Sequence, residues 1–385
     1  MIKILLGGSP CTFWSIARAG RETHPSGVGW ELFENYLIAK EKFQPDFFIY
    51  ENNQKIHSSI VEEIRRLLGC GTDSNTHCIE IDSALVSAQK RRRFYIHNCG
   101  NVKQPADRGI LFQDILDNGI VERDKAYCLT CHEGNTRDYF LKRQTNLVFI
   151  PIYDELAANK SKNISNDKYY RIYFADGKAA TMCAGDIQSV LDNGLHLPLF
   201  SGTYSFETSG SIKPANPKLP SPIYEIRNGE ILIRGRKYPV NLKDGLYTIR
   251  KLSSAECCRL QTLPEDYCRS VSNTQAYRCI GNGWTAEVII HILSYALRNI
   301  PKNEEVVVLS LYDGIGTGRY CLNKMGFTHV KYYAYEIDKH AIKVATSNFP
   351  DIIECGDAFQ VREQSFQENF CQINYPITNI LGEVT

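Results

Sequence analysis

The sequence has almost no net charge, because 44 Lys and Arg residues oppose 43 Asp and Glu residues and leave a formal charge of +1. A protein that coats nucleic acid through general basic charge is therefore not expected, although a local basic cleft is not excluded. No hydrophobic run approaches the length of a membrane span, and only a short apolar run precedes the first Gly-Gly-Ser turn, so we expect no signal peptide. These absences predict a cytoplasmic protein whose 14 cysteines are reduced thiols.

Recognisable metal patterns are also missing. Cys128-Leu-Thr-Cys131-His132 matches the haem-attachment pattern, but that chemistry requires export, so we interpret the match as chance. No second cysteine pair lies at the spacing of zinc ligands. We therefore expect no metal site.

The first hundred residues alternate between strand-like and helical patterns, which predicts an α/β protein with a mostly parallel, doubly wound sheet. At 385 residues with 43% hydrophobic content, the chain can form one large domain and a smaller one. Strands are expected at 2–6, 46–50, 78–82 and 94–97, and helices at 30–43 and 57–68.

The regular alternation of strand-like and helical runs stops in the middle of the chain. Between residues 120 and 245, short strand-like runs at 147–153, 169–174 and 230–233 alternate with loop-like segments at 201–210 and 213–222. We interpret this region as an irregular, β-rich insert whose scattered basic residues are compatible with an ordinary solvated surface. The expected division is a catalytic half at 1–119, a recognition domain at 120–270 and a cofactor-binding half at 271–385.

The stretch from 306 to 357 predicts a βαβαβ unit with a glycine-rich loop after its first strand. The dinucleotide pattern Gly-x-Gly-x-x-Gly is absent, since the glycines stand at 314, 316 and 318. This favours an adenosyl cofactor without pyrophosphate, such as S-adenosylmethionine, over NAD. Glu336 would receive the ribose hydroxyls and Asp357 the adenine amino group. The alternative is a Rossmann-like core without such a site.

Cys11 and Glu51 each come after a buried strand, so both can lie at the same edge of one sheet. A thiolate beside a carboxylic acid suits attack on an electron-poor ring that is protonated on nitrogen. Arg91 and Arg93 occupy alternating positions, which in an extended segment share one face and could grip a base carbonyl and a phosphate. The alternatives are a buried cysteine after a turn and a solvated basic run.

Together these segments resemble the motif set of the DNA (cytosine-5) methyltransferases, most closely the animal de novo enzymes and their bacteriophage-type relatives. The resemblance covers nearly all of the chain outside residues 120 to 245. The motifs are Gly7-Gly-Ser-Pro-Cys11, Glu51-Asn52, Gln89-x-Arg91-x-Arg93, Arg250-Lys-Leu-Ser-x-x-Glu256-x-x-Arg259-Leu-Gln261-x-x-Pro264, Gly281-Asn-Gly-Trp284, Asp313-Gly-Ile-Gly-Thr-Gly318, Glu336-Ile337 and Gly356-Asp357.

The resemblance implies transfer of a methyl group from S-adenosylmethionine to C5 of a cytosine flipped out of double-stranded DNA. Cys11 would attack C6, Glu51 would hold and protonate N3, Arg93 would contact the base carbonyl or the Cys11 loop, and Arg91 would assist. The insert would read base edges in the major groove, and the loop at 13–29 would close over the flipped base. The implied cofactor residues are Tyr312, Asp313, Gly314, Ile315, Thr317, Gly318, Glu336, Ile337, Asp357, Asn282 and Trp284.

The order of the motifs departs from the family, because the cysteine motif comes first and the cofactor motifs come last. This resembles a circular permutation cut between the third and fourth strands of the sheet. It predicts that the strand at 2–6 lies beside the strand at 306–310. Termini that lie close together make such a rearrangement tolerable.

Three other functions stay open at this point. They are an RNA cytosine methyltransferase, a catalytically silent DNA-binding regulator on the same fold, and transfer of a group other than methyl. Asn53 and Thr12 depart from the family beside the catalytic residues, and the tail at 361–385 has no counterpart. The expected setting is the cytoplasm of a bacterial or phage-infected cell; a restriction partner cannot be inferred from the residues.

Overall fold

The computed structural model describes residues 1–15, 18–130, 145–151, 204–206, 211–214, 223–233, 236–364 and 366. Two compact units divide the chain. The first comprises residues 1–110, 128–132 and 257–385, and the second comprises 111–127 and 133–256. The functional division expected at residues 119 and 270 stays a prediction.

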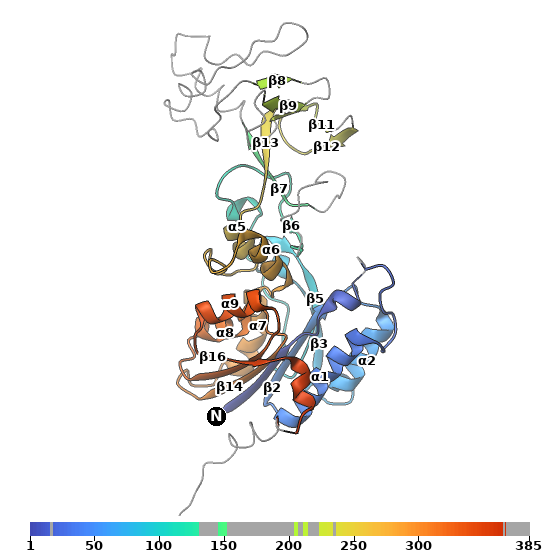
Figure 1. Cartoon of the computed structure of the whole chain (residues 1–385), viewed down its shortest axis with the longest axis vertical. Coiled ribbons are helices and arrows are strands. Elements are labelled where there is room, and N and C mark those ends of the chain that lie inside the picture. Colours follow the sequence, from blue (N-terminus) through green and yellow to red (C-terminus); the bar gives the residue numbers. More distant parts are fainter. Residues whose placement is uncertain are drawn as a thin grey trace, which may run out of the picture. The chain divides into compact units, whose positions relative to one another are not determined.

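A seven-stranded sheet with the order β16-β15-β14-β1-β2-β5-β3 forms the centre of the first unit (Figure 1). Its strands are β1 (Ile2–Gly7), β2 (Phe47–Asn53), β3 (His77–Asp82), β5 (Arg92–His97), β14 (Val306–Leu311), β15 (Val330–Tyr335) and β16 (Ile352–Gly356). Strands β16, β15, β14, β1 and β2 pair in parallel, whereas β5 runs antiparallel to β2 and β3. The sheet is therefore mixed, with the expected parallel arrangement in the five strands from the edge strand β16 to β2.

Helices cover both faces of this sheet (Figure 1). They are α1 (Val28–Phe43), α2 (Ser58–Leu68), α6 (Asn273–Asn282), α7 (Ala286–Leu297), α8 (Thr317–Lys324) and α9 (Lys339–Asn348). Short 3-10 turns are η1 (Cys11–Phe13), η2 (Ser83–Leu85) and η5 (Ala358–Arg362), and β4 is Gln89–Lys90. All six residues of β14 are buried, as a strand covered on both faces requires.

The strand at the amino-terminal end pairs with the first strand of the cofactor half, as predicted. Ile2 aligns with Val306 and Gly7 with Leu311 along an uninterrupted parallel register. About 300 residues of sequence separate these partners, yet they are neighbours at the centre of the sheet. The described end of the chain packs near them, because Val361 of η5 belongs to the same buried cluster as Leu5 of β1 and Val307 of β14.

The second unit contains an antiparallel sheet with the order β12-β11-β10-β13-β7, and β9 and β8 continue from β10. Its elements are η3 (Gln113–Ile115), β6 (Ala126–Tyr127), β7 (Leu147–Pro151), β8 (Tyr204–Phe206), β9 (Ser211–Pro214), β10 (Ile223–Arg227), β11 (Glu230–Ile233), β12 (Arg236–Pro239) and β13 (Gly245–Lys251). Helix α5 (Ser254–Leu260) spans the boundary between the units. The core of this sheet is a cluster of Phe149, Ile226, Ile231, Val240 and Tyr247.

Several local predictions were wrong. Residues 51–53 belong to β2, because they pair with Arg93–Tyr95 of β5 rather than following the strand. Segments expected to be loops contain β8 and overlap β9, and helix α6 was not expected before the Gly-Asn-Gly turn. The run at 169–174 lies outside the described residues.

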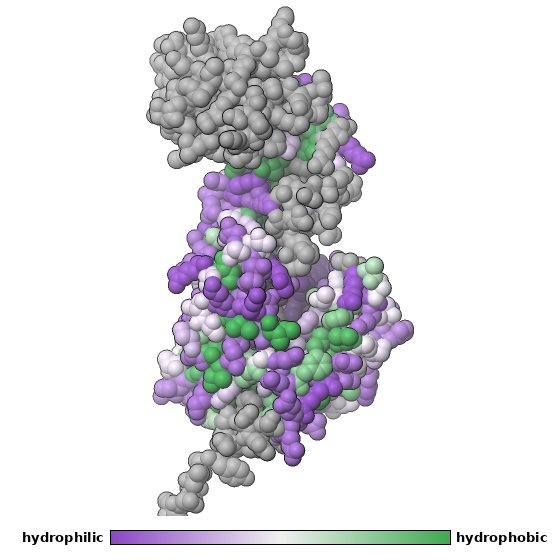
Figure 2. All heavy atoms as spheres, in the orientation of Figure 1, coloured by the Kyte–Doolittle hydropathy of each residue, from purple (hydrophilic) through white to green (hydrophobic). Residues whose placement is uncertain are grey.

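No helix among the described residues is long and apolar enough to cross a membrane. Figure 2 shows a mostly hydrophilic surface over the first unit, interrupted by small hydrophobic patches. Among the exposed large hydrophobic residues, Ile337 is 74% exposed. This residue is one of the expected cofactor contacts.

His97 on β5 makes the stability of the first unit sensitive to acid. It is fully buried, its Nδ1 accepts the backbone N–H of Cys99 (3.2 Å), and its Nε2 has no hydrogen-bond partner. Burial lowers the pKa of His97 from 6.5 to about 4. The unfolded chain therefore binds a proton that the folded chain rejects as the pH falls from 6.5 towards 4.

We expect wild-type protein to lose about 2 kcal/mol of stability through this residue between pH 7 and about pH 5. His97→Asn keeps an acceptor for the Cys99 amide but does not titrate there, so its stability should fall less over the same interval. Urea denaturation at both pH values measures the difference. Equal acid sensitivity of the two proteins would contradict the assignment.

Candidate functional site

The Cys11 loop leaves the carboxyl end of β1 and lies against Glu51 of β2. A Cβ atom built on Gly8 would stand 2.4 Å from the carbonyl oxygen of Glu51. Neither Gly7 nor Gly8 has a positive φ, so close approach of the two backbones, and not left-handed geometry, is the reason for glycine here. Glycine thereby allows the cysteine and the carboxylate to occupy neighbouring positions.

The Asn52 side chain anchors the Cys11 loop through hydrogen bonds. Its Nδ2 donates to the carbonyl of Ser9 and to the hydroxyl of Tyr50, both at 3.0 Å, and the Ser9 and Tyr50 hydroxyls share a hydrogen bond of 2.8 Å. Asn52 is 2% exposed, and buried polar groups of this kind persist only when they are paired. Asn52 therefore holds the Cys11 loop in place, whereas the neighbouring Glu51 side chain faces the site.

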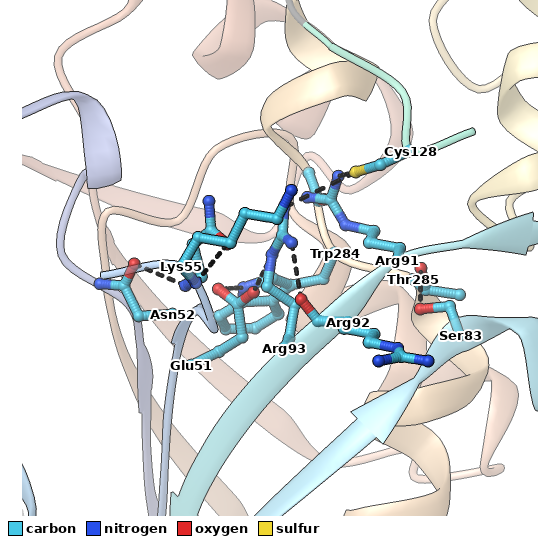
Figure 3. Close-up of polar contacts among 12 residues, drawn as sticks. Glu51, Asn52, Lys55, Ser83, Arg91, Arg92, Arg93, Cys128, Trp284 and Thr285 are labelled. Carbon is cyan, nitrogen blue, oxygen red and sulfur yellow. Dashed lines mark hydrogen bonds and ion pairs between the residues drawn. The ribbon is translucent and has the colours of Figure 1, made fainter. Parts of the chain in front are cut away.

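Both carboxylate oxygens of Glu51 have donors (Figure 3). Arg93 Nε lies 3.0 Å from Glu51 Oε1, and Trp284 Nε1 donates to Oε2 at 3.1 Å. Arg93 comes from the neighbouring strand β5, whereas Trp284 follows α6 from the far end of the sequence. The structure places the indole N–H of Trp284 on the catalytic candidate Glu51, and its expected contact with the cofactor stays a prediction.

Arg91 and Arg93 meet at a third residue that the sequence did not single out for this role. Arg91 Nη1 donates to Cys128 Sγ at 3.2 Å and Arg93 Nη2 to the same sulfur at 3.8 Å. Arg91 Nη2 also donates to the carbonyl of Gly283 at 2.8 Å. The two guanidinium groups outweigh burial and lower the pKa of Cys128. Figure 3 shows this thiol beside both arginines.

The pKa of the Cys11 thiol shifts in the opposite direction to that of Cys128. Burial, followed by the charge of Glu51, raises the pKa of the Cys11 thiol, and the charges of Arg93 and Arg91 only partly offset this rise. The free protein therefore carries Cys11 as a protonated thiol near neutral pH. The attacking thiolate must form when the surroundings change or a base accepts the proton.

A network of buried amides joins three motifs that are distant in sequence. Gln89 Nε2 donates to Gln261 Oε1 (2.9 Å), which also accepts the hydroxyl of Thr285 (2.8 Å). Gln261 Nε2 in turn donates to the carbonyl of Gly283 (3.1 Å). These bonds fix the turn that carries Trp284, so the glutamines position the site without entering it.

Arg250 and Glu256 have a structural role within the second unit. Two hydrogen bonds of 2.7 and 2.8 Å join the guanidinium to the carboxylate, which also accepts the backbone N–H of Asp117 (2.8 Å). The Glu256 side chain is fully buried and has several donors. This motif holds β13 to the start of α5.

The glycine-rich loop follows β14 and has the backbone geometry that a bound ligand needs. Gly314 and Gly316 have φ values of 65° and 75°, which few other residues adopt. At Gly314 a Cβ atom would meet nothing within 4 Å, whereas at Gly318 it would stand 2.4 Å from the Tyr332 hydroxyl. Tyr312 also has a positive φ of 59°, and its hydroxyl donates to the carbonyl of Leu32 (2.7 Å).

Backbone N–H groups hold the carboxylates of Glu336 and Asp357, which follow β15 and β16. Glu336 Oε2 accepts the N–H of Gly314 (2.9 Å), and Oε1 accepts the N–H of Ile337 (2.8 Å). Asp357 Oδ1 accepts the N–H of Phe359 (3.0 Å), which starts the final 3-10 turn. Asn282 is exposed at the end of α6, and Ile315 is buried beneath the loop, where its carbonyl accepts the Tyr267 hydroxyl (3.0 Å).

A sequence profile described as C-5 cytosine-specific DNA methylase matches residues 1–297. The chain belongs to this family. The match includes the Cys11, Glu51 and Arg91–Arg93 motifs and ends before the glycine-rich loop. A search of curated proteins finds no match.

Solved structures similar to this methylase include three methyltransferases. Entamoeba histolytica EhMeth shares 14% identity with a TM-score of 0.35, covering 77% of this chain and 78% of its own. A variant of Spodoptera frugiperda DNMT2 shares 13% identity with a TM-score of 0.39, covering 76% and 79%. A putative DNA modification methyltransferase from an Escherichia coli prophage shares 15% identity with a TM-score of 0.31, covering 77% and 79%.

The methylase family uses S-adenosylmethionine, and the residues near the glycine-rich loop fit that group. Asp313 Oδ2, Thr317 Oγ1 and both carboxylate oxygens of Glu354 are buried without a hydrogen-bond partner. Such atoms are costly to bury unless a ligand or water pairs with them. Ile337 presents an exposed apolar surface beside Glu336. A carboxylate with an adjacent apolar surface is a combination that suits an adenosine moiety.

Two residues of this methylase site were not identified from the sequence. Cys128 lies 35 residues after Arg93 and far from Cys11 in sequence, and no spacing rule connects them. Glu354 stands inside a strand-like run and gives no local signal. Within the part of the chain that the structure describes, no group of three or more His, Cys, Asp or Glu side chains could hold a metal ion.

Glu51→Gln should lower the pKa of Cys11, because it removes the nearest negative charge and leaves Arg93 free of its carboxylate partner. Alkylation of Cys11 by iodoacetamide, followed by mass spectrometry of its peptide across a range of pH, measures the titration midpoint. The midpoint should shift to lower pH in the variant. Glu63→Gln, which affects a surface pair with Arg66, is the control; an unchanged midpoint in Glu51→Gln would contradict this electrostatic coupling.

Proposed function

We propose that this methylase transfers the methyl group of S-adenosylmethionine to C5 of a flipped cytosine in double-stranded DNA. The observation that carries the proposal is Glu51, whose two carboxylate oxygens face Arg93 and Trp284 while its backbone contacts the Cys11 loop. This arrangement places an acid on β2 beside a nucleophile in the loop that follows the adjacent strand β1. The family supports cytosine C5 as the acceptor.

The chemistry of this chain begins at the cytosine ring. Cys11, after losing its proton, forms a bond from sulfur to C6, and the displaced electron pair moves through C5 and C4 onto N3, which takes a proton from the protonated Glu51 carboxyl. Arg93 holds Glu51 by its Nε and has further N–H groups for the base carbonyl. S-adenosylmethionine supplies an electrophilic methyl group when bound. After C5 is alkylated, N3 returns its proton to Glu51 and the C5 proton leaves to water, so the C6–S bond breaks, the Cys11 thiolate departs and the aromatic ring is restored.

The cofactor residues would have the following roles. Glu336 would accept the ribose hydroxyls, Ile337 would cover the adenine, and Asp357 would accept its amino group. Asp313, Gly314 and Thr317 belong to the glycine-rich loop, where Gly314 leaves open space around its Cα atom. Ile315, Gly318 and Tyr312 support that loop, and Asn282 stands beside it by resemblance.

We assign substrate recognition to the second unit and its antiparallel sheet. The proposed catalytic residues all belong to the first unit, so the second unit takes no part in the reaction itself. We assign duplex DNA as its partner. An RNA substrate would be revealed by methylation of tRNA in place of duplex DNA, and a silent regulator by binding of DNA without methylation.

Cys11→Ala should abolish methyl transfer, by at least about a thousandfold, because the covalent step is lost. Binding of S-adenosylmethionine should persist, and Cys70→Ala should keep activity, since Cys70 lies beyond the end of α2. Incorporation of labelled methyl groups into duplex DNA measures the rate, and bisulfite sequencing gives the target.

A second measurement uses duplexes with 5-fluorocytosine. Wild-type protein should form an adduct that survives denaturant, because fluorine cannot leave C5 as a proton does. Substantial transfer by Cys11→Ala would contradict the mechanism.

We also propose that the chain is a circular permutation of the family order. Parallel pairing of Ile2–Gly7 with Val306–Leu311 supports it, as does the packing of Val361 in one buried cluster with Leu5 of β1. Moving residues 305–385 ahead of Met1, through a flexible linker from Thr385, should give a folded protein with activity. Cofactor binding by calorimetry and methyl transfer test this arrangement. A folded but inactive rearranged protein would contradict the proposed continuity.

A further inference from the structure

The two arginines beside Glu51 each direct a nitrogen atom at the same sulfur. Arg91 Nη1 lies 3.2 Å from Cys128 Sγ, and Arg93 Nη2 lies 3.8 Å from it. A guanidinium group donates hydrogen bonds but cannot accept them, so the sulfur must accept from both. Two positive groups that meet at one atom repel each other unless that atom is negative. This geometry suits a thiolate better than a neutral thiol, which is a weak acceptor.

Arg91 has no carboxylate partner among the described residues. It is 4% exposed, and its guanidinium donates to the carbonyls of Leu129 (3.5 Å), Gly281 (3.4 Å) and Gly283 (2.8 Å) as well as to the sulfur. A buried charge is costly unless an opposite charge compensates it. Of these partners, only Cys128 can ionise and supply that charge.

Arg93 is held at all three of its guanidinium nitrogens. Its Nε lies 3.0 Å from Glu51 Oε1, its Nη1 donates to the carbonyl of Arg92 (2.8 Å), and its Nη2 donates to the sulfur of Cys128. A planar group held at three atoms has one orientation. Figure 3 shows Arg93 between Glu51 and Cys128. The side chains of Arg93 and Glu51 are 14% and 12% exposed, so water screens these contacts little.

A neutral Cys128 thiol would have one use for its proton. Its sulfur lies 3.5 Å from the carbonyl of Leu129, to which a thiol could donate. Arg91 Nη1 reaches the same carbonyl at 3.5 Å, so this acceptor has a donor without the thiol. Although burial opposes ionisation, the charges of Arg91 and Arg93 lower the pKa of Cys128. In return, the charges of Glu51 and Cys128 raise the pKa of Arg93 against the effect of burial.

A thiolate at Cys128 makes the cluster neutral. The positive charges of Arg91 and Arg93 are then matched by the negative charges of Glu51 and Cys128. A residue without charge at position 128 would leave an excess positive charge beside Glu51. Such a charge favours the ionised carboxylate, which cannot give a proton to cytosine N3. Cys128 can therefore influence the reaction without contacting Glu51.

We propose that Cys128 is a positioning residue of this reaction, whose thiolate supplies the counter-charge of Arg91 and Arg93. With that charge in place, Arg93 stays against Glu51, and Arg91 stays on the turn that leads to Trp284. The inference rests on the proposed function and adds a residue to its machinery. Cys128 acts through the two arginines and need not touch the base.

Three variants at position 128 separate charge from shape. Cys128→Asp and Cys128→Asn have nearly the same shape but differ in charge, and Cys128→Ser removes the thiolate with little change in size. Single-turnover transfer of labelled methyl groups to duplex DNA measures the rate of the chemistry. The Asp variant should stay close to the wild-type rate, whereas the Asn and Ser variants should lose about ten- to a hundredfold, as expected when a reacting group is misplaced. Cys70→Ser is the control for loss of a cysteine.

Alkylation of the wild-type protein tests the thiolate directly. Iodoacetamide is added to low conversion across a range of pH, and mass spectrometry gives the initial rate at each cysteine. The midpoint of Cys128 should lie below those of Cys70 and Cys11, because burial raises the pKa of both. Arg91→Gln should raise the Cys128 midpoint, since it removes one of the two cations. Arg66→Gln, which affects a surface pair, should leave it unchanged.

The outcomes separate the two proposals. If wild-type protein transfers methyl groups and the Asp and Asn variants react at equal rates, the inference about Cys128 is wrong while the proposed function stands. A wild-type rate in Cys128→Ser also overturns the inference. So does a Cys128 midpoint at or above that of Cys70, a result that needs no variant to fold. If wild-type protein methylates neither duplex DNA nor tRNA, the proposed function fails and this inference fails with it.

Discussion

Parallel pairing between β1 and β14 is the constraint on which the site depends. It joins Ile2–Gly7 to Val306–Leu311, so that the loop with Cys11 and the glycine-rich loop leave adjacent strand ends. The entropy of closing a long loop grows only with the logarithm of its length, so a separation of about 300 residues adds little to the free energy of folding. It does favour slow folding, because the central pair forms only after distant segments meet.

Buried charged groups are paired around Glu51 but lack partners around Glu354. Around Glu51 every charge has a partner, since Arg93 and Trp284 hold its oxygens and Arg91 and Arg93 share Cys128. Such a network keeps catalytic groups in one geometry before substrate arrives. Around Glu354 the carboxylate oxygens have no partner.

The sequence predicted features that depend on local pattern. Buried strands and the glycine-rich loop follow from apolar runs and turn residues, whereas the neighbouring ends at Cys11 and Asp313 were expected from the resemblance to the family's motif set. It did not predict that Trp284 would bond to Glu51, because that contact depends on the fixed turn after α6. The contacts of Cys128 were not predicted for a related reason: its thiol becomes significant only where two arginines from another segment converge on it.

The order of the motifs matters less than the contacts between strand ends. Gly8 must be small because the backbone of Glu51 approaches it, and this requirement is the same whichever segment is synthesised first. The register of β1 with β14 likewise specifies which side chains face the helices, independently of the connection between them. A break in the chain is tolerated where it severs a connection and leaves these pairings intact. The proposed permutation satisfies that condition, because both strands of the central pair remain whole.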